Sequence, residues 1–453
     1  MVLKSAMDFL KDKVAGSWYG MAVGDAMGLA AKSIKPETVR QLFGAMDSFK
    51  DVRPFIGKGI KRFTMQGLYG GLTQSSLVIA DCLLKNKKGG VSEISQLLLK
   101  LSAGGPEHYF GVYRRPEKGF YKSICALKEK PPRAVEHDQA DAAFLTMGIP
   151  AGIIHRDRPE AGIRLNVDIG LLLSRNLCEV TGLALTGYLA SRFLSLELGN
   201  AEGPVAEAEQ ILTDAEEFCQ KVETRFRETA PGLWNETAES ARGMLGQTLE
   251  GLRKRWNIGL DELLEWVCQN ASDWHKTSVT SPAQGYVLTL LPLCLILVLR
   301  EGRGFDSSLT GGLNMGKAAD KVGVLVGAWS GAIYGWQGIP ESWRSGLVNG
   351  KEVRLRAEGL FSRRFPKGAK DIYEMELGLT SKEFEVGKKY FQKTSTKFTR
   401  PTPRPMLSWE DDSAGEPVIP EKSDAASWRK FHKDKSRMKK DRRKHLKEND
   451  DDD

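Results

Sequence analysis

The sequence contains few residues whose types and spacing indicate chemistry. The six cysteines are widely separated with no CxxC pair, and the six histidines do not show the i, i+4 spacing of a helical metal pair. The segment from Gly311 to Lys317 lacks the spacing of a phosphate-binding loop, and no Gly-x-Ser-x-Gly elbow follows a strand pattern. Asp25 and Asp320, each in a glycine-rich segment, are the candidates for acid–base chemistry.

These two segments repeat glycine at every fourth residue, which places the glycines on one stripe of a helix. Glycine costs about 1 kcal/mol relative to alanine inside a helix, so close approach of a second backbone is the expected compensation. We predict that both stripes pack against other helices in the core, with each other as one possible partner. The glycines are Gly16, Gly20, Gly24 and Gly28 in the first stripe, and Gly323, Gly327, Gly331 and Gly335 in the second.

The rest of residues 1–360 also favours helices, because apolar residues recur at spacings of three and four and no segment shows a sustained period of two. We predict an all-α domain. The longest apolar run, from Tyr286 to Leu299, contains Pro292 and is too short to span a membrane, so it is interpreted as a buried helix. Further helical segments are expected at Ser92–Leu101, Ala206–Arg225, Glu236–Arg255 and Leu260–Asn270.

Charge and proline content change towards the C-terminus. The net charge is +8, but residues 429–447 carry eleven Lys/Arg against two Asp, which is +9, and residues 448–453 contribute −5. The prolines at 401, 403, 405, 417 and 420 interrupt regular structure. We therefore predict a helical domain at 1–360, a proline-containing linker or irregular extension at 361–421, and a disordered tail at 422–453, basic and then acidic.

Four blocks of the sequence resemble the ADP-ribosylglycohydrolase family. They span residues 16 to about 345, roughly three quarters of the chain. The resemblance implies a large orthogonal helical bundle of the type seen in that family. The blocks are Gly20-Met-Ala-Val-Gly24-Asp25-Ala26-Met27-Gly28, Gly70-Gly71-Leu72-Thr73-Gln74-Ser75-Ser76-Leu77, the stretch from Pro116 to Leu127 leading to Asp141–Ile154, and Asn314–Pro340 with Trp343.

Members of this family hydrolyse the bond between ADP-ribose and an acceptor, and the resemblance implies two divalent cations, Mg²⁺ or Mn²⁺, held by carboxylates. Hard cations need such oxygen ligands. Of five acids expected at matched positions, only Asp320 remains. The others are replaced by Gln74, Ser75, Ala318 and Lys32, while Thr73 is retained and Lys321 stands where the family has Thr.

The charge at these positions thus changes from −5 to about +1, and we predict no metal and no cofactor. We interpret the chain as a catalytically inactive relative that acts as a binding or scaffold protein. ADP-ribose, a nucleotide or another phosphate compound is the candidate ligand, and Lys32, Thr73, Gln74, Ser75, Asp320 and Lys321 are the candidate binding residues. In a second interpretation, both lysines point to solvent at the rim of a closed cleft.

Two other functions stay open from the sequence. One is a divergent hydrolase that uses one metal, Mg²⁺ or Mn²⁺, or none, with Asp25 and Asp320 as acid–base groups. The other is an interaction protein whose basic tail contacts RNA or another polyanion without sequence specificity. The N-terminus carries charges within its first thirteen residues and no signal-peptide core, so a cytoplasmic location is expected, and the Lys/Arg run leaves a nuclear one open.

Overall fold

The computed structural model describes residues 2–86, 90–130, 132–135, 137, 140–196 and 207–394. Within these ranges the chain forms helices and only isolated β-bridges, so the all-α prediction is confirmed. The α-helices are α1 (Val2–Ala31), α2 (Pro36–Phe43), α3 (Gly71–Lys85), α4 (Val91–Leu101), α5 (Lys118–Leu127), α6 (Gly148–Ile154), α7 (Pro159–Leu173), α8 (Leu177–Leu194), α9 (Ala208–Thr229), α10 (Glu236–Ser240), α11 (Met244–Lys254), α12 (Leu260–His275), α13 (Val287–Leu295), α14 (Phe305–Leu313), α15 (Ala319–Tyr334), α16 (Glu341–Gly346), α17 (Gly350–Ser362) and α18 (Ile372–Thr394).

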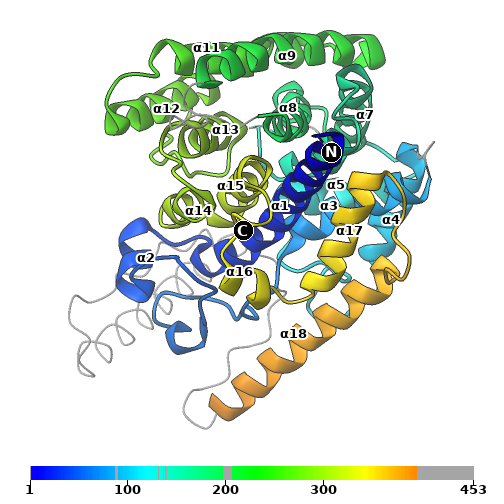
Figure 1. Cartoon of the computed structure of the whole chain (residues 1–453), viewed down its shortest axis with the longest axis vertical. Helices are drawn as coiled ribbons and strands as arrows, with labels where there is room; N and C mark the ends of the chain where they lie inside the picture. Colours follow the sequence, from blue (N-terminus) through cyan, green and yellow to red (C-terminus); the bar gives the residue numbers. More distant parts are fainter. Residues whose placement is uncertain are drawn as a thin grey trace, which may run out of the picture.

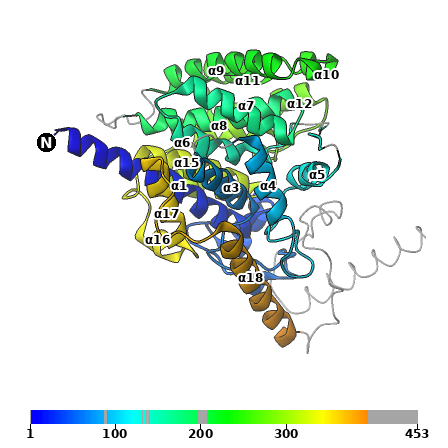
Figure 2. The same ribbon diagram turned by 90° about the vertical axis from the view of Figure 1, so that its right-hand side faces the viewer.

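Helices α1 and α15 form the centre of the bundle, and the two glycine stripes are their contact. A Cβ built on Gly20 would lie 2.3 Å from the carbonyl oxygen of Gly327, and one on Gly24 would lie 1.8 Å from that of Gly323. Only glycine allows this approach, so the predicted packing of the stripes is confirmed and the stripes are each other's partners. The N-terminal part of α1 projects from the bundle (Figure 2).

The other helices surround this central pair. Figure 1 shows α9 and α11 side by side in an outer layer, with α8 and α13 between that layer and α15. The predicted buried helix at Tyr286–Leu299 is confirmed as α13, which continues into a π-helical turn at Ile296–Arg300. No described helix is long and apolar enough to cross a membrane.

Two predicted boundaries differ from the structure. The single helix expected at Glu236–Arg255 is divided into α10 and α11, because Gly243 adopts a left-handed conformation with φ 71°. The expected irregular extension at 361–421 contains α18, so this prediction is wrong for residues 372–394. The remainder of that segment and the predicted tail at 422–453 lie outside the described residues.

Helix α18 binds to the bundle through polar side chains that a search for apolar periodicity does not detect. Glu376 and Arg114, both fully buried, form an ion pair of 2.8 Å. Thr380 accepts a hydrogen bond from Arg114 at 2.9 Å, and Glu383 pairs with Arg115 at 3.0 Å. The inward face of α18 therefore carries charge where the sequence pattern leads one to expect apolar residues.

Candidate functional site

The C-terminal end of α1 and the first turn of α15 lie next to each other because the glycine stripes continue to this end of the helix pair. A Cβ on Gly28 would lie 2.4 Å from the carbonyl oxygen of Ala319. Lys32 directly follows α1, and Asp320 and Lys321 are in the first turn of α15. The backbone contact thus places three of the predicted site residues together.

These three residues belong to a group of five charged side chains, here called the ion cluster: Lys32, Glu117, Asp141, Asp320 and Lys321. Lys32 Nζ lies 2.7 Å from Asp320 Oδ2 and also pairs with Glu117 Oε1. Lys321 Nζ lies 2.9 Å from Glu117 Oε2 and 3.0 Å from Asp141 Oδ1. Glu117 therefore connects the two lysines.

Local structure holds the two added acids in place. Glu117 is the residue before α5, where the positive end of the helix dipole favours a carboxylate. Asp141 lies in the loop before α6, and its backbone N–H donates to Glu179 Oε1 at 2.7 Å. The side chain of Glu179 is also within 2.9 Å of His137 Nδ1. The loop that carries Asp141 is thus fixed by a buried glutamate on α8.

The ion cluster is mostly buried, with side-chain exposures of 2% for Asp320, 8% for Lys321, 11% for Glu117 and 12% for Lys32. Burial alone would lower the pKa of both lysines, but the neighbouring carboxylates outweigh it and raise the pKa of each. Burial would raise the pKa of Glu117, yet the two lysines lower it to about 2. For Asp320, burial raises the pKa and Lys32 opposes that shift.

Two positive and three negative groups give the ion cluster a net charge of −1 when all are ionised. The matched positions considered from sequence alone came to about +1, because Glu117 and Asp141 were not counted. The interpretation in which both lysines point to solvent is wrong, since each ammonium group is enclosed and paired with two carboxylates.

Asp25 and Thr73 form a separate contact that joins α1 to the start of α3. Asp25 Oδ2 accepts hydrogen bonds from Gly70 N at 3.0 Å, Thr73 N at 2.9 Å and Thr73 Oγ1 at 2.6 Å. Gly70 is the N-cap residue of α3 and has no side chain to satisfy the first N–H groups, so Asp25 supplies the acceptor from another helix. Burial raises the pKa of Asp25 to about 6, and the hydrogen bond from Thr73 opposes this.

Gln74 and Ser75, predicted to bind a ligand, are instead buried in the packing around α3. Gln74 Nε2 donates to Val112 O at 2.9 Å and to Glu376 Oε2 at 2.8 Å, and its Oε1 accepts from Arg114 N at 2.7 Å. Ser75 Oγ donates to Leu72 O at 2.9 Å. The polar atoms of Gln74 and Ser75 are therefore used inside the protein.

The residues present do not fit a pair of divalent cations. Ammonium groups lie among the carboxylates, Gln74 presents its amide nitrogen to Glu376, and Ala318 offers no side-chain oxygen. Within the described ranges, no group of three or more His, Cys, Asp or Glu side chains is spaced to hold a metal ion. Lysine repels a cation at the positions where the family's chemistry needs negative charge.

Sequence reasoning missed Glu117 and did not assign a role to Asp141. A signal was available for both: two lysines introduced into a buried position require carboxylates nearby, and the blocks that contain Glu117 and Asp141 were already matched. Glu376 on α18 was missed because the domain was ended at residue 360.

Comparisons with known proteins agree with this architecture. The sequence profile of the ADP-ribosylglycohydrolase family matches residues 6–370. A solved structure described as an ADP-ribosylglycohydrolase-related protein complex superposes with a TM-score of 0.52 at 19% identity, covering 79% of this chain and 99% of the other. No curated protein is similar enough in sequence to count as a match. The profile match over most of the chain shows that this protein belongs to the ADP-ribosylglycohydrolase family.

Proposed function

We propose that this protein is a catalytically inactive family member that acts as a scaffold or binding protein. The observation that carries the proposal is the pairing of Lys32 and Lys321 with Glu117, Asp320 and Asp141. The two ammonium groups supply the positive charge that carboxylates in such a cleft need, so the fold keeps its charge balance without cations.

A divalent cation entering the ion cluster would meet these lysines at close range. Two unit charges about 4 Å apart repel by about 4 kcal/mol at an effective dielectric near 20, and a divalent ion doubles that figure. Moving a lysine aside would also leave Glu117 or Asp320 buried without its partner, at a cost of several kcal/mol. Both terms oppose metal binding and hence metal-dependent hydrolysis.

Binding of ADP-ribose or another phosphate compound through Lys32 and Lys321 stays a prediction, with weaker support than the scaffold role. A phosphate would compete with three carboxylates for the same two ammonium groups, in a cluster whose net charge is already −1. We therefore favour recognition of a partner by another part of the molecule. Polyanion binding by the basic tail also stays a prediction, and the tail lies outside the described residues.

The alternative of a hydrolase using one metal or none has a specific difficulty. Asp25 is completely buried, and one of its carboxylate oxygens already accepts three hydrogen bonds. A general acid or base must reach the substrate within hydrogen-bonding distance. Asp25 instead fulfils the requirements of a helix cap.

The test combines calorimetry and thermal denaturation. We expect wild-type protein to show no Mn²⁺ binding, no change in Tm between EDTA and Mn²⁺, and no release of ADP-ribose from ADP-ribosylated peptides. The double variant Lys32→Met/Lys321→Met leaves three carboxylates unneutralised, so its Tm should fall in EDTA and recover in part with Mn²⁺. Lys254→Met, which removes an exposed ion pair with Glu250, is the matched control and should change the free energy of unfolding by less than about 1 kcal/mol.

Wild-type binding of Mn²⁺ together with turnover would refute the proposal. If the double variant does not fold, the single Lys32→Met variant and the wild-type titration still decide between the alternatives. Titration of ADP-ribose into wild-type protein in EDTA separates the scaffold role from metal-free ligand binding, because only the latter predicts heat of binding that Lys32→Met abolishes.

A further inference from the structure

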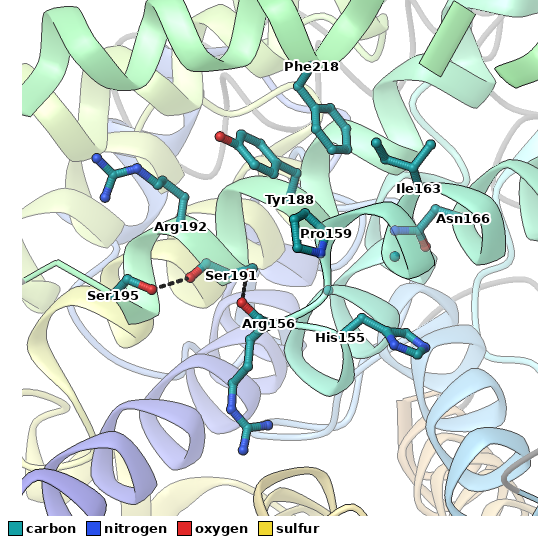
Figure 3. Close-up of a pocket in the computed structure, with 12 residues that line it drawn as sticks. His155, Arg156, Pro159, Ile163, Asn166, Tyr188, Ser191, Arg192, Ser195 and Phe218 are labelled. Atoms are coloured by element: carbon teal, nitrogen blue, oxygen red, sulfur yellow. Dashed lines mark hydrogen bonds between the residues drawn. The ribbon is translucent and has the colours of Figure 1, made fainter. Parts of the chain in front are cut away.

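A cavity of about 140 Å³ lies between α6, α7, α8 and α9, on a different part of the molecule from the ion cluster. Figure 3 shows Tyr188 and Phe218 on one side of Pro159, with Asn166 and His155 on another. Neither the proposed scaffold role nor the resemblance to hydrolases uses this cavity.

One wall of the cavity is aromatic and apolar. The rings of Tyr188 and Phe218 are stacked, with centroids 4.1 Å apart and an angle of 17° between their planes. Pro159 and Ile163 from α7 complete this wall. Such a surface gains free energy by covering a flat apolar ring.

The opposite side contains polar atoms with no partner. Asn166 is 1% exposed, and its Oδ1 has no hydrogen bond within the described part of the chain. The Nδ1 atom of His155 is also buried without a hydrogen bond among these residues. An unsatisfied buried polar atom costs about 1–3 kcal/mol, so a molecule that donates a hydrogen bond here is stabilised by removing that cost.

The charged residues around the cavity do not call for a charged ligand. Arg156 donates to the carbonyl oxygens of Ile153 at 2.9 Å and Phe361 at 3.0 Å, and Arg192 pairs with Asp214 at 3.3 Å. Figure 3 shows both guanidinium groups directed away from Pro159. Burial lowers the pKa of His155, and nearby arginines lower it further, so the imidazole is neutral near pH 7.

We propose that this cavity binds a small uncharged ring compound with one hydrogen-bond donor. The ring lies against Tyr188 and Phe218, and the donor satisfies Asn166 Oδ1. A cavity near 150 Å³ is large enough for a benzene-sized molecule. The competing occupant is a group of water molecules, which the apolar wall disfavours.

Phenol and toluene are a matched pair of probes, because they have nearly the same shape and only phenol donates a hydrogen bond. We expect wild-type protein to bind phenol more tightly than toluene, measured by calorimetry and by NMR shifts of the Asn166 side-chain amide. In Asn166→Leu, phenol affinity should fall at least tenfold while toluene affinity is kept or improved. A tenfold loss corresponds to about 1.4 kcal/mol, within the range for one hydrogen bond.

Two further variants make the result interpretable. Ser191→Ala is the control, because Ser191 lines the same cavity but its hydroxyl already donates to Arg156 O at 3.3 Å, so phenol affinity should change by less than about twofold. Ile163→Phe should fill the cavity and abolish binding of both probes, and it serves if Asn166→Leu does not fold. Absence of phenol binding to wild type, or equal phenol affinity in Asn166→Leu, would overturn the proposal.

Discussion

The contact between α1 and α15 leads to a sharp prediction for Gly24→Ala. The added Cβ would lie 1.8 Å from the carbonyl oxygen of Gly323, whereas ordinary contact begins at 3.4 Å. The two backbones would have to separate by about 1.6 Å, and no side-chain rotation can relieve the clash because both groups are main-chain atoms.

The expected magnitude follows from two opposing terms. Overpacking a core costs about 1–3 kcal/mol and occasionally more, and a contact with rigid backbone belongs at the upper end. Replacing glycine by alanine in a helix returns up to about 1 kcal/mol. The net loss should therefore be about 2 kcal/mol or more. With an unfolding entropy of about 2 cal/mol/K per residue over about 400 residues, this loss lowers Tm by about 2–3 °C.

Tryptophan fluorescence during thermal denaturation is a suitable assay, because Trp18 on α1 and Trp329 on α15 are both fully buried in the helix pair. Gly378→Ala is the control: this glycine is also within a helix, but it is exposed and has no atoms within 4 Å of a built Cβ. Its Tm should stay constant or rise slightly. If Gly24→Ala were as stable as wild type, the backbone contact could not have the geometry described.

Two other predictions concern buried carboxyl groups. Glu376→Ala leaves Arg114 buried without its ion-pair partner and should lower the free energy of unfolding by about 3–5 kcal/mol in urea denaturation, whereas the exposed neighbour Glu374→Ala should have little effect; equal losses would contradict the buried pair. Because burial raises the pKa of Asp25 from 3.8 to about 6, the folded state holds this proton more tightly, and the stability contribution of Asp25 should fall by about 3 kcal/mol as pH rises from below 4 to above 6. Asp25→Asn should remove that decline, and an unchanged pH profile would show that Asp25 does not titrate in this range.

The fold was predictable where one residue type had no other explanation. Glycine at every fourth position is costly in a helix unless another backbone comes close, so Gly16 to Gly28 indicated the central packing. Helix α18 escaped prediction because its buried face contains Glu376, Thr380 and Glu383, which mimic an exposed helix in a hydropathy pattern. The prolines that follow from 401 then moved the predicted boundary too far towards the N-terminus.

The candidate site was predictable in part. The resemblance aligned Lys32, Asp320 and Lys321, and the structure brings these three together. It could not show that Gln74 bonds to α18, because a side chain's direction depends on helices distant in sequence. Nor did the alignment of known motifs draw attention to Glu117, since its importance arises only from the two lysines that it joins.

The way α1 is held to α15 has a consequence for how the family can diverge. Main-chain atoms of glycine fix the distance between these helices, and the ionisable residues at their common end do not bridge the interface along its length. Exchange of carboxylates for lysines at that end therefore leaves the architecture intact. Sequence drift at the reaction centre can proceed without selection against misfolding, so a lineage can lose its chemistry and still retain a stable protein available for a different role.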